Sequence, residues 1–212
     1  VARQTNKYSS AISAAAKKVT SQSPYPQGEM AAQLKTVARL IAGGLKTKVY
    51  MVSTGGFDTH GGQVQNSDTT TGAHANLLRQ LSDAIAAFMT DCKNLGVGQR
   101  VLGMTFSEFG RRIKSNGSLV TDHGSAQPVF IFGEYAATGV LGNNPILKGI
   151  DEATNVQMQY DFRSIYSTIL RDWFCVSAAD TTTMLLKNYQ YLPFMNDTAG
   201  ENMQGDLSGR GG

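Results

Sequence analysis

The sequence predicts an α/β fold built on a mostly parallel sheet. The apolar runs VLGMTF (101–106) and PVFIFG (128–133) are rich in Val, Ile and Phe and too short for free-standing helices, so each is predicted to be a buried strand. Two helical patterns are each followed closely by such a run, and for consecutive units of this kind a right-handed crossover and a parallel sheet are the default. The apolar fraction of 41% with 23 glycines is typical of a soluble α/β protein with many tight turns.

The first of these units spans residues 27–53. A helical stretch around 10–19 stops before Pro24 and Pro26. A second helix is predicted over 27–45, where Gly43-Gly44 would end it. Its apolar residues recur at spacings of three and four: Met30, Leu34, Val37, Ala38 and Ile41. A strand is predicted at Lys48–Ser53, close enough behind the helix to form one αβ unit.

The second unit contains the clearest helix of the chain, over 73–95. It follows a polar loop at 61–72, and a turn at 94–99 leads into the strand at Val101. Further on we expect a surface segment at 134–150, a helix at 161–172 and an irregular, apolar stretch at 181–195. Residues 1–195 are therefore predicted to form one α/β domain, with a flexible glycine-rich tail at 196–212.

Composition and charge exclude several classes of protein. The formal charge of +3 is spread along the 212 residues, which gives no electrostatic reason to expect nucleic acid as a partner. No apolar run approaches 18 residues, so no membrane span is expected. Cys92 and Cys175 lack metal-type spacing, which favours two thiols over one disulfide. Because the chain begins at Val1 without Met, we expect an N-terminal segment to have been removed or to lie outside it.

Acidic and imidazole side chains gather beside the predicted strands. Asp58 and His60 follow the run at 49–52 and a Gly-Gly pair. Glu108 follows the run at 101–106, and Asp122 and His123 precede the run at 128–133. Ligands bind outside strand ends in open α/β sheets, so these clusters predict a site. Carboxylate and imidazole ligands together suit Zn, Mn or Fe.

Each cluster also has a simpler interpretation. Asp58 could cap the following turn with His60 exposed in a loop, and Glu108 could form a surface ion pair with Arg111 or Arg112, of little energetic value. Asp122-His123 could be a turn with a solvated imidazole. The argument for a site is therefore joint, since two of the three histidines fall in acid-bearing clusters. The third, His74, is predicted to be a cap or packing residue.

Six segments together resemble a known family. GGFDTHGGQ, AFMTDCKNLG, TFSEFGRR, NGS, TDHGSAQPVFIFG and DFRSIYSTIL occur in this order within about residues 33–173. This series resembles the bacterial domain of unknown function 1501 family, whose mostly exported members imply a periplasmic or extracellular location. That family is grouped with the alkaline-phosphatase-like superfamily, which includes sulfatases. The resemblance implies a doubly wound α/β fold with helices on both faces of a mostly parallel sheet, of which this chain resembles the C-terminal part.

The resemblance also implies a two-metal site, with Zn or Mn as the expected ion. Asp58 and His60 resemble the Asp and His that hold the first metal, and His123 resembles the late His that returns to it, with Asp122 assisting. Glu108 stands where an acid is shared with the second metal. Arg111 or Arg112 could clamp an anionic oxygen bidentately. Nothing before Val49 resembles the superfamily's strand, acid and nucleophile, so the nucleophile is expected on an upstream segment or a second chain that completes the domain.

Two functions follow as expectations. One is a metal-dependent hydrolase of phosphate or sulfate esters, acting on a small anionic substrate. The other is a noncatalytic structural or binding/assembly protein that retains the hydrolase fold, favoured by the missing nucleophile and by Phe109 standing where the superfamily has a histidine ligand. A homo-oligomer is possible under either function.

Overall fold

The computed structural model describes residues 2–151 and 153–196, and these fall into two compact units. Unit 1 comprises residues 2–101 and 116–120, and unit 2 comprises 102–115, 121–151 and 153–196. The tail predicted at 196–212 lies outside the described residues except for Asn196, whose N–H donates to the carbonyl of Tyr135.

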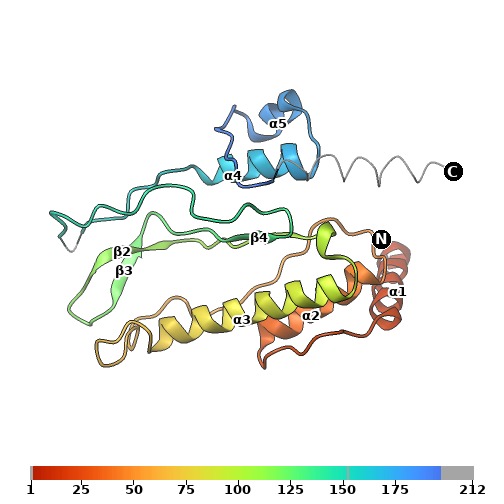
Figure 1. Cartoon of the computed structure of the whole chain (residues 1–212), viewed down its shortest axis with the longest axis horizontal. Coiled ribbons are helices and arrows are strands. Elements are labelled where there is room, and N and C mark those ends of the chain that lie inside the picture. The colour runs from red at the N-terminus through yellow and green to blue at the C-terminus, as the bar shows by residue number, and fades with distance from the viewer. Residues whose placement is uncertain (1, 152, 197–212) are drawn as a thin grey trace. The chain divides into compact units, whose positions relative to one another are not determined.

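Unit 1 is helical. Its elements are α1 (Ala2–Lys18), α2 (Glu29–Ala42), α3 (Ala73–Asn94) and the short 3-10 helix η1 (Gly98–Arg100). In this unit α2 packs against both α1 and α3 (Figure 1). The buried face of α2 carries Ala31, Leu34 and Ala38, which recur at the predicted helical spacing. A Cβ added to Gly43 would lie 2.2 Å from the carbonyl oxygen of Ala15, so the end of α2 approaches α1 as closely as only glycine permits.

Unit 2 contains short strands and short helices. Its elements are β1 (Leu102–Met104), β2 (Gly110–Ser115), β3 (Thr121–Gly124), β4 (Ile131–Gly133), α4 (Phe162–Thr168), the single π-helical turn η2 (Ile169–Trp173) and α5 (Ala178–Leu185). β1 pairs with β4 and β2 pairs with β3, both antiparallel. The core of the unit is formed by buried residues that are far apart in the sequence: Tyr135, Trp173, Leu192, Phe194 and Met195.

The predicted α/β fold with a mostly parallel sheet is wrong. In the described part of the chain the strands form two separate two-stranded antiparallel sheets, and most of the regular structure is helical. The runs at 101–106 and 128–133 do contain β1 and β4, but these strands pair with each other in opposite directions. The physical reason is the connection: parallel strands need a crossover that is usually a helix, and the segment between β1 and β4 contains the β2–β3 hairpin instead.

The strand predicted at Lys48–Ser53 is also absent. Residues 45–59 form neither helix nor strand, because no described segment pairs with them. Thr121–Gly124 was predicted to precede a strand, yet it is itself strand β3. The helices predicted over 27–45, 73–95 and 161–172 are confirmed within a few residues at each end, with the last one finishing as η2.

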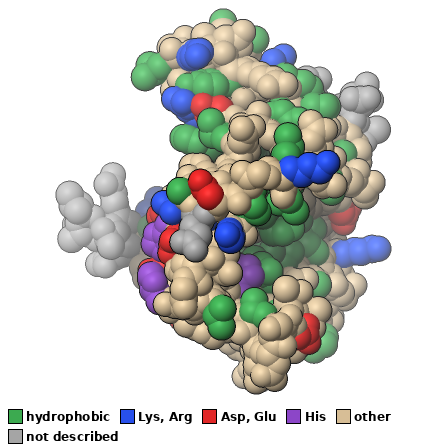
Figure 2. Space-filling model, turned by 90° about the vertical axis from the view of Figure 1, so that its left-hand side faces the viewer, with side chains coloured by type: hydrophobic (Ala, Val, Ile, Leu, Met, Phe, Trp, Pro, Cys, Tyr) green, Lys and Arg blue, Asp and Glu red, His purple; other side chains and the backbone are tan. Residues whose placement is uncertain are grey.

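Three further features bear on the sequence analysis. Cys92 and Cys175 are both free thiols, and Cys92 is buried. None of the helices in the described residues combines the length and apolarity that crossing a bilayer requires. On the face drawn in Figure 2 the Lys and Arg side chains are distributed among side chains of other kinds.

The N-terminus of α4 gives a prediction about pH. Asp161 caps the helix by accepting the backbone N–H of Arg163 at 2.9 Å, and its two oxygens also accept from the Arg163 guanidinium at 2.9 and 2.7 Å. These bonds lower the pKa of Asp161 to about 2 from its usual 3.8. A lowered folded-state pKa means that the stabilisation is present above the usual value and is lost as the pH falls toward 2.

We therefore expect Asp161→Asn, which retains a capping oxygen but loses the charge, to melt below the wild type at neutral pH. The difference in melting temperature should close as the pH falls between 3.8 and about 2. Thermal unfolding followed by circular dichroism across this range is the measurement. A difference that stays constant at every pH would contradict the role assigned to the charge.

Candidate functional site

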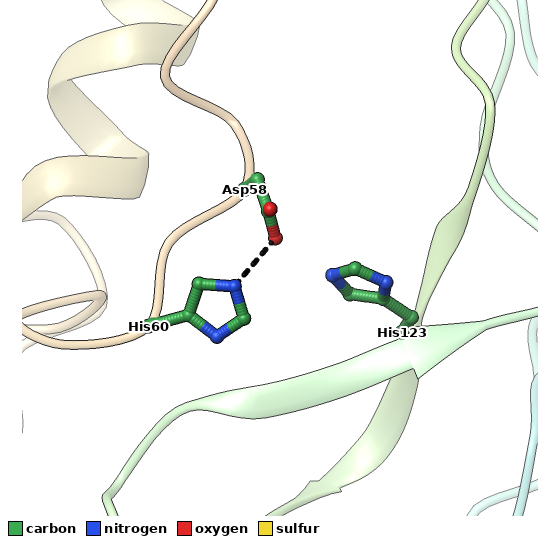
Figure 3. Close-up of side chains that lie close together, drawn as sticks. All are labelled: Asp58, His60 and His123. Carbon is green, nitrogen blue, oxygen red and sulfur yellow. Dashed lines mark ion pairs between the residues drawn. The ribbon is translucent and has the colours of Figure 1, made fainter.

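Asp58 and His60 form the first part of the candidate site. Nε2 of His60 lies 3.0 Å from Oδ1 of Asp58, and the side chains are 74% and 53% exposed, respectively (Figure 3). Both belong to unit 1 and lie in the segment between α2 and α3. Asp58 and His60, which are separated by one residue in the sequence, thus lie together and are accessible to solvent.

The local backbone explains why these two side chains face the same way. Thr59, between them, is buried at 8% exposure, whereas Asp58 and His60 are exposed, so the middle side chain points away from its two neighbours. Gly56, just upstream, has a φ of +92°, which a residue with a Cβ rarely adopts. Phe57 contacts the ring of His74 edge-on, with centroids 6.1 Å apart. Buried Thr59 and the Phe57 contact therefore anchor the segment, and Asp58 and His60 project from it.

His74 has the packing role predicted for it. It lies in the first turn of α3, where its backbone N–H donates to the carbonyl of Gln63, and its ring contacts Phe57. The loop between the Asp58 segment and α3 thereby supplies an acceptor for one of the first helical N–H groups. Through the ring of His74, helix α3 contacts Phe57, the residue next to Asp58.

Unit 2 presents the other predicted residues on the β2–β3 hairpin. Arg111 and His123 are register partners on the two strands. The imidazole of His123 stacks on the ring of Phe109, with centroids 3.8 Å apart and an interplanar angle of 10°. The Arg111 guanidinium lies 5.5 Å from the same ring centroid and donates to the carbonyl of Thr121 at 2.6 Å. Phe109 therefore fixes the orientation of His123, which is exposed.

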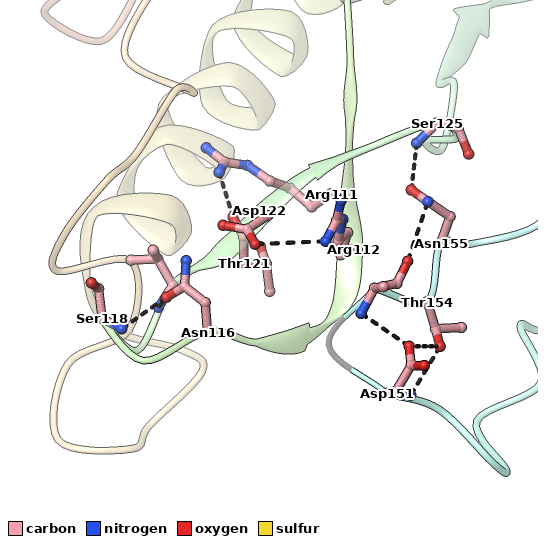
Figure 4. Close-up of polar contacts among 12 residues, drawn as sticks. Arg111, Arg112, Asn116, Ser118, Thr121, Asp122, Ser125, Asp151, Thr154 and Asn155 are labelled. Atoms are coloured by element: carbon pink, nitrogen blue, oxygen red, sulfur yellow. Dashed lines mark hydrogen bonds and ion pairs between the residues drawn. The ribbon is translucent and has the colours of Figure 1, made fainter.

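A second set of contacts supports the same hairpin (Figure 4). The Arg112 guanidinium lies 3.8 Å from Oδ2 of Asp122. The backbone N–H of Ile113 donates to the carbonyl of Thr154, and that of Ser125 donates to Oδ1 of Asn155. The segment 154–155 thus borders the hairpin. Asp122, predicted to assist His123, forms this ion pair with Arg112.

Glu108 stands apart from these contacts. It is exposed in the bend between β1 and β2, and among the described residues no hydrogen bond or ion pair of its carboxylate is seen. The hairpin replaces the strand ends at which Glu108, Arg111 and His123 were expected. Within the separate units, the structure thus brings together Asp58 with His60, and Arg111 with His123 and Phe109.

Phe109 is the residue that sequence reasoning missed. The sequence interpretation treats it only as the residue that replaces a histidine ligand of the superfamily, and its contact with His123 depends on the pairing of β2 with β3. The available signal was Asn116-Gly117 between two segments with strand propensity, which favours a hairpin. A hairpin places residues on either side of its loop opposite one another, and so would have placed position 109 near position 123.

In unit 1, Asp58 and His60 together offer two potential ligand atoms for a metal ion. An exposed carboxylate and an exposed imidazole at 3.0 Å offer one oxygen and one nitrogen donor, the mixture that Zn and Mn accept.

Comparison with curated proteins and with solved structures finds no match. A family model does match, over residues 3–176, and its description is "Protein of unknown function (DUF1501)". Because that match covers most of the 212 residues, the chain belongs to the DUF1501 family.

Proposed function

We propose that this chain acts as a metal-dependent hydrolase of phosphate or sulfate esters. The observation that carries the proposal is the exposed pair of Asp58 and His60, whose donor atoms are 3.0 Å apart. The ion would be zinc or manganese, with these two residues as its first ligands. The resemblance of the GGFDTH motif to the metal ligands of the alkaline-phosphatase-like superfamily supports this assignment through the motif alone, since the fold expected from it is wrong.

The remaining residues have roles that follow from their chemistry. Glu108 and His123 are the further ligands that the resemblance implies. Arg111 and Arg112 would bind anionic oxygens of the substrate, since a guanidinium presents paired donors to them. The stacking on Phe109 holds the His123 ring in one orientation, which lowers the entropy that ligation would cost. A bound divalent ion would polarise the ester oxygen and lower the pKa of a water molecule. The same resemblance supports a periplasmic or extracellular location.

Metal binding provides the first test. We expect the chelator-treated protein to bind Zn²⁺ or Mn²⁺ in isothermal titration calorimetry, and Asp58→Asn to weaken binding at least tenfold. Asp83→Asn is the matched control, because Asp83 is also an exposed aspartate of unit 1 and lies on α3. Circular dichroism should show that both variants keep their helices. Equal metal affinity for wild type and Asp58→Asn would refute the ligand assignment.

Activity provides the second test. We expect the metal-loaded protein to hydrolyse aryl phosphate or aryl sulfate esters, and the His60→Ala/His123→Ala variant to lose this activity with its fold intact. Protein that stays inert toward both ester classes after Zn²⁺ and Mn²⁺ addition would contradict the hydrolase proposal. The calorimetric result then decides whether the metal has a noncatalytic role.

The second candidate function is a noncatalytic binding or assembly protein. The observation that favours it is the segment 140–147 in unit 2, whose apolar side chains are unusually exposed, with Val140 at 91% and Ile146 at 78%. Exposed apolar side chains of this kind mark interaction surfaces in many proteins. Under this function the His60→Ala/His123→Ala variant would keep its oligomeric state and its binding properties.

A further inference from the structure

The segment 48–52 of unit 1 has the properties of a strand without a partner. It runs between α2 and α3 as irregular chain (Figure 1). Within the part of the chain that the structure describes, its backbone N–H and C=O groups make no hydrogen bonds. A row of unpaired backbone groups is a template for pairing with another chain.

The side chains of this segment alternate as they do in a sheet. Val49 and Met51 are 72% and 79% exposed, whereas Tyr50 and Val52 are partly buried. One face is therefore covered by the unit and the other, apolar, face is open. This is the period-two pattern of a half-buried strand, present here without its neighbours.

One edge of the segment is bordered by a side chain of α2, whereas the backbone groups of the other edge make no hydrogen bonds within the described residues. The side-chain amide of Gln33 accepts the N–H of Ser53 at 3.0 Å and donates to the Ser53 carbonyl at 3.1 Å. Backbone groups of alternate residues in a strand point to opposite edges. The edge carrying the groups of Ser53 and Met51 is thus bordered by α2, and the edge carrying those of Lys48, Tyr50 and Val52 is the one available for pairing.

We propose that this free edge pairs with the same segment of a second copy of the chain, antiparallel, with Tyr50 opposite Tyr50. An antiparallel pair of identical strands is two-fold symmetric, which is the commonest symmetry of homodimers. In this register Val49 of each copy lies beside Met51 of the other on the open face. The two exposed apolar side chains thereby gain apolar cross-strand partners.

The charges of the segment favour this arrangement over a parallel one. Lys46 and Lys48 both precede the apolar residues. In the antiparallel register Lys48 lies opposite Val52 and Lys46 opposite Thr54, so no two lysines face each other. A parallel, in-register pair would place each lysine beside its own copy, which is destabilising. Since one strand pair buries little surface, the dimer is expected to be weak and concentration-dependent.

Charge variants at the paired positions test the register. Val49→Lys with Met51→Lys places lysine opposite lysine at both apolar pairs, and we expect the dimer dissociation constant to rise about tenfold in analytical ultracentrifugation. Val49→Lys with Met51→Glu places lysine opposite glutamate, and this variant should dimerise about as well as the wild type. If both variants weaken the dimer equally, or neither does, the proposed register is wrong.

Proline variants test the edge. Lys48→Pro removes an N–H directed at the partner, whereas Val49→Pro removes one on the edge bordered by α2, so only the first should abolish the dimer. Neither N–H is hydrogen-bonded within the described chain, so both variants should retain their helices by circular dichroism. A wild-type chain that sediments as a monomer at every concentration would overturn the proposal. So would a dimer that Lys48→Pro leaves intact.

Discussion

Replacing Asp91 by alanine is expected to lower the free energy of unfolding by about 3 kcal/mol. Asp91 lies on α3 and is completely buried. Its carboxylate accepts the backbone N–H of Gln22 at 2.6 Å and the hydroxyl of Tyr25 at 3.0 Å. Alanine would remove the acceptor of both part-buried hydrogen bonds, and each hydrogen bond to a charged group contributes about 1.5–3 kcal/mol. Urea unfolding followed by circular dichroism measures the loss.

Two variants separate the contributions of the Asp91 carboxylate. Asp91→Asn keeps the shape and one acceptor oxygen, so it should lower the free energy of unfolding by less than Asp91→Ala does. Tyr25→Phe removes one of the two hydrogen bonds and should cost about 1 kcal/mol. If Asp91→Ala costs no more than Tyr25→Phe, the bond to Gln22 does not stabilise the link between α1 and α2.

The same hydrogen bond adds a pH dependence at the alkaline end. Burial first, and then the hydrogen bond to Asp91, raise the pKa of Tyr25 well above its usual value of 10.0. A raised folded-state pKa means that this contribution is complete below pH 10.0 and declines above it, because the unfolded chain then loses the proton more readily. The wild type should therefore lose stability above that pH more steeply than Tyr25→Phe, and parallel pH profiles would contradict this.

The helices were predictable because their signals are local. On α2 and α3 the buried residues recur at the spacing of a helical face, and Gly43 and Gly72 lie at the ends of these helices. The strand signal at Lys48–Ser53 was equally clear, and the exposure of Val49 and Met51 retains its alternation. A strand, however, is completed by a partner, and no pattern within six residues specifies which segment that is.

The parallel direction predicted for the runs that form β1 and β4 was wrong for a different reason. The segment between them carries no helical pattern, and a parallel pair would have required a crossover. Asn116 begins the loop of the intervening hairpin, where its side-chain oxygen accepts the N–H of Ser118 at 2.9 Å. These features favour an antiparallel sheet, so the sequence contained the information from which the pairing could be inferred.

The candidate site was predictable to the extent that its contacts are local. Only one residue separates Asp58 from His60, so their proximity depends on the local chain and not on the pairing of distant segments. The stacking of Phe109 on His123 spans the hairpin, so it depended on a register that was not predicted. The role predicted for Glu108 depended on the edge of a parallel sheet, and the described residues form no parallel sheet.

Replacing Trp173 by alanine should cost about 3–5 kcal/mol, the largest loss expected from a single substitution in unit 2. Trp173 ends η2 and is 8% exposed within the core of the unit, where its ring lies 6.4 Å from that of Tyr135. Leu192 enters the same core, fixed by its backbone N–H donating to the buried hydroxyl of Thr168. Alanine would leave a cavity bounded by residues that are far apart in the sequence, so the surroundings can collapse only partly.

Circular dichroism must follow this unfolding, because Trp173 is the only tryptophan of the chain and the variant loses the fluorescence probe. Phe162→Ala is the matched control: Phe162 is an aromatic residue of the adjoining helix α4, but it is 56% exposed and should cost about 0.5 kcal/mol or less. Trp173→Phe should recover part of the loss, since a ring still fills part of the space. A Trp173→Ala variant as stable as Phe162→Ala would mean that Tyr135, Leu192 and Trp173 do not form the core that holds unit 2 together.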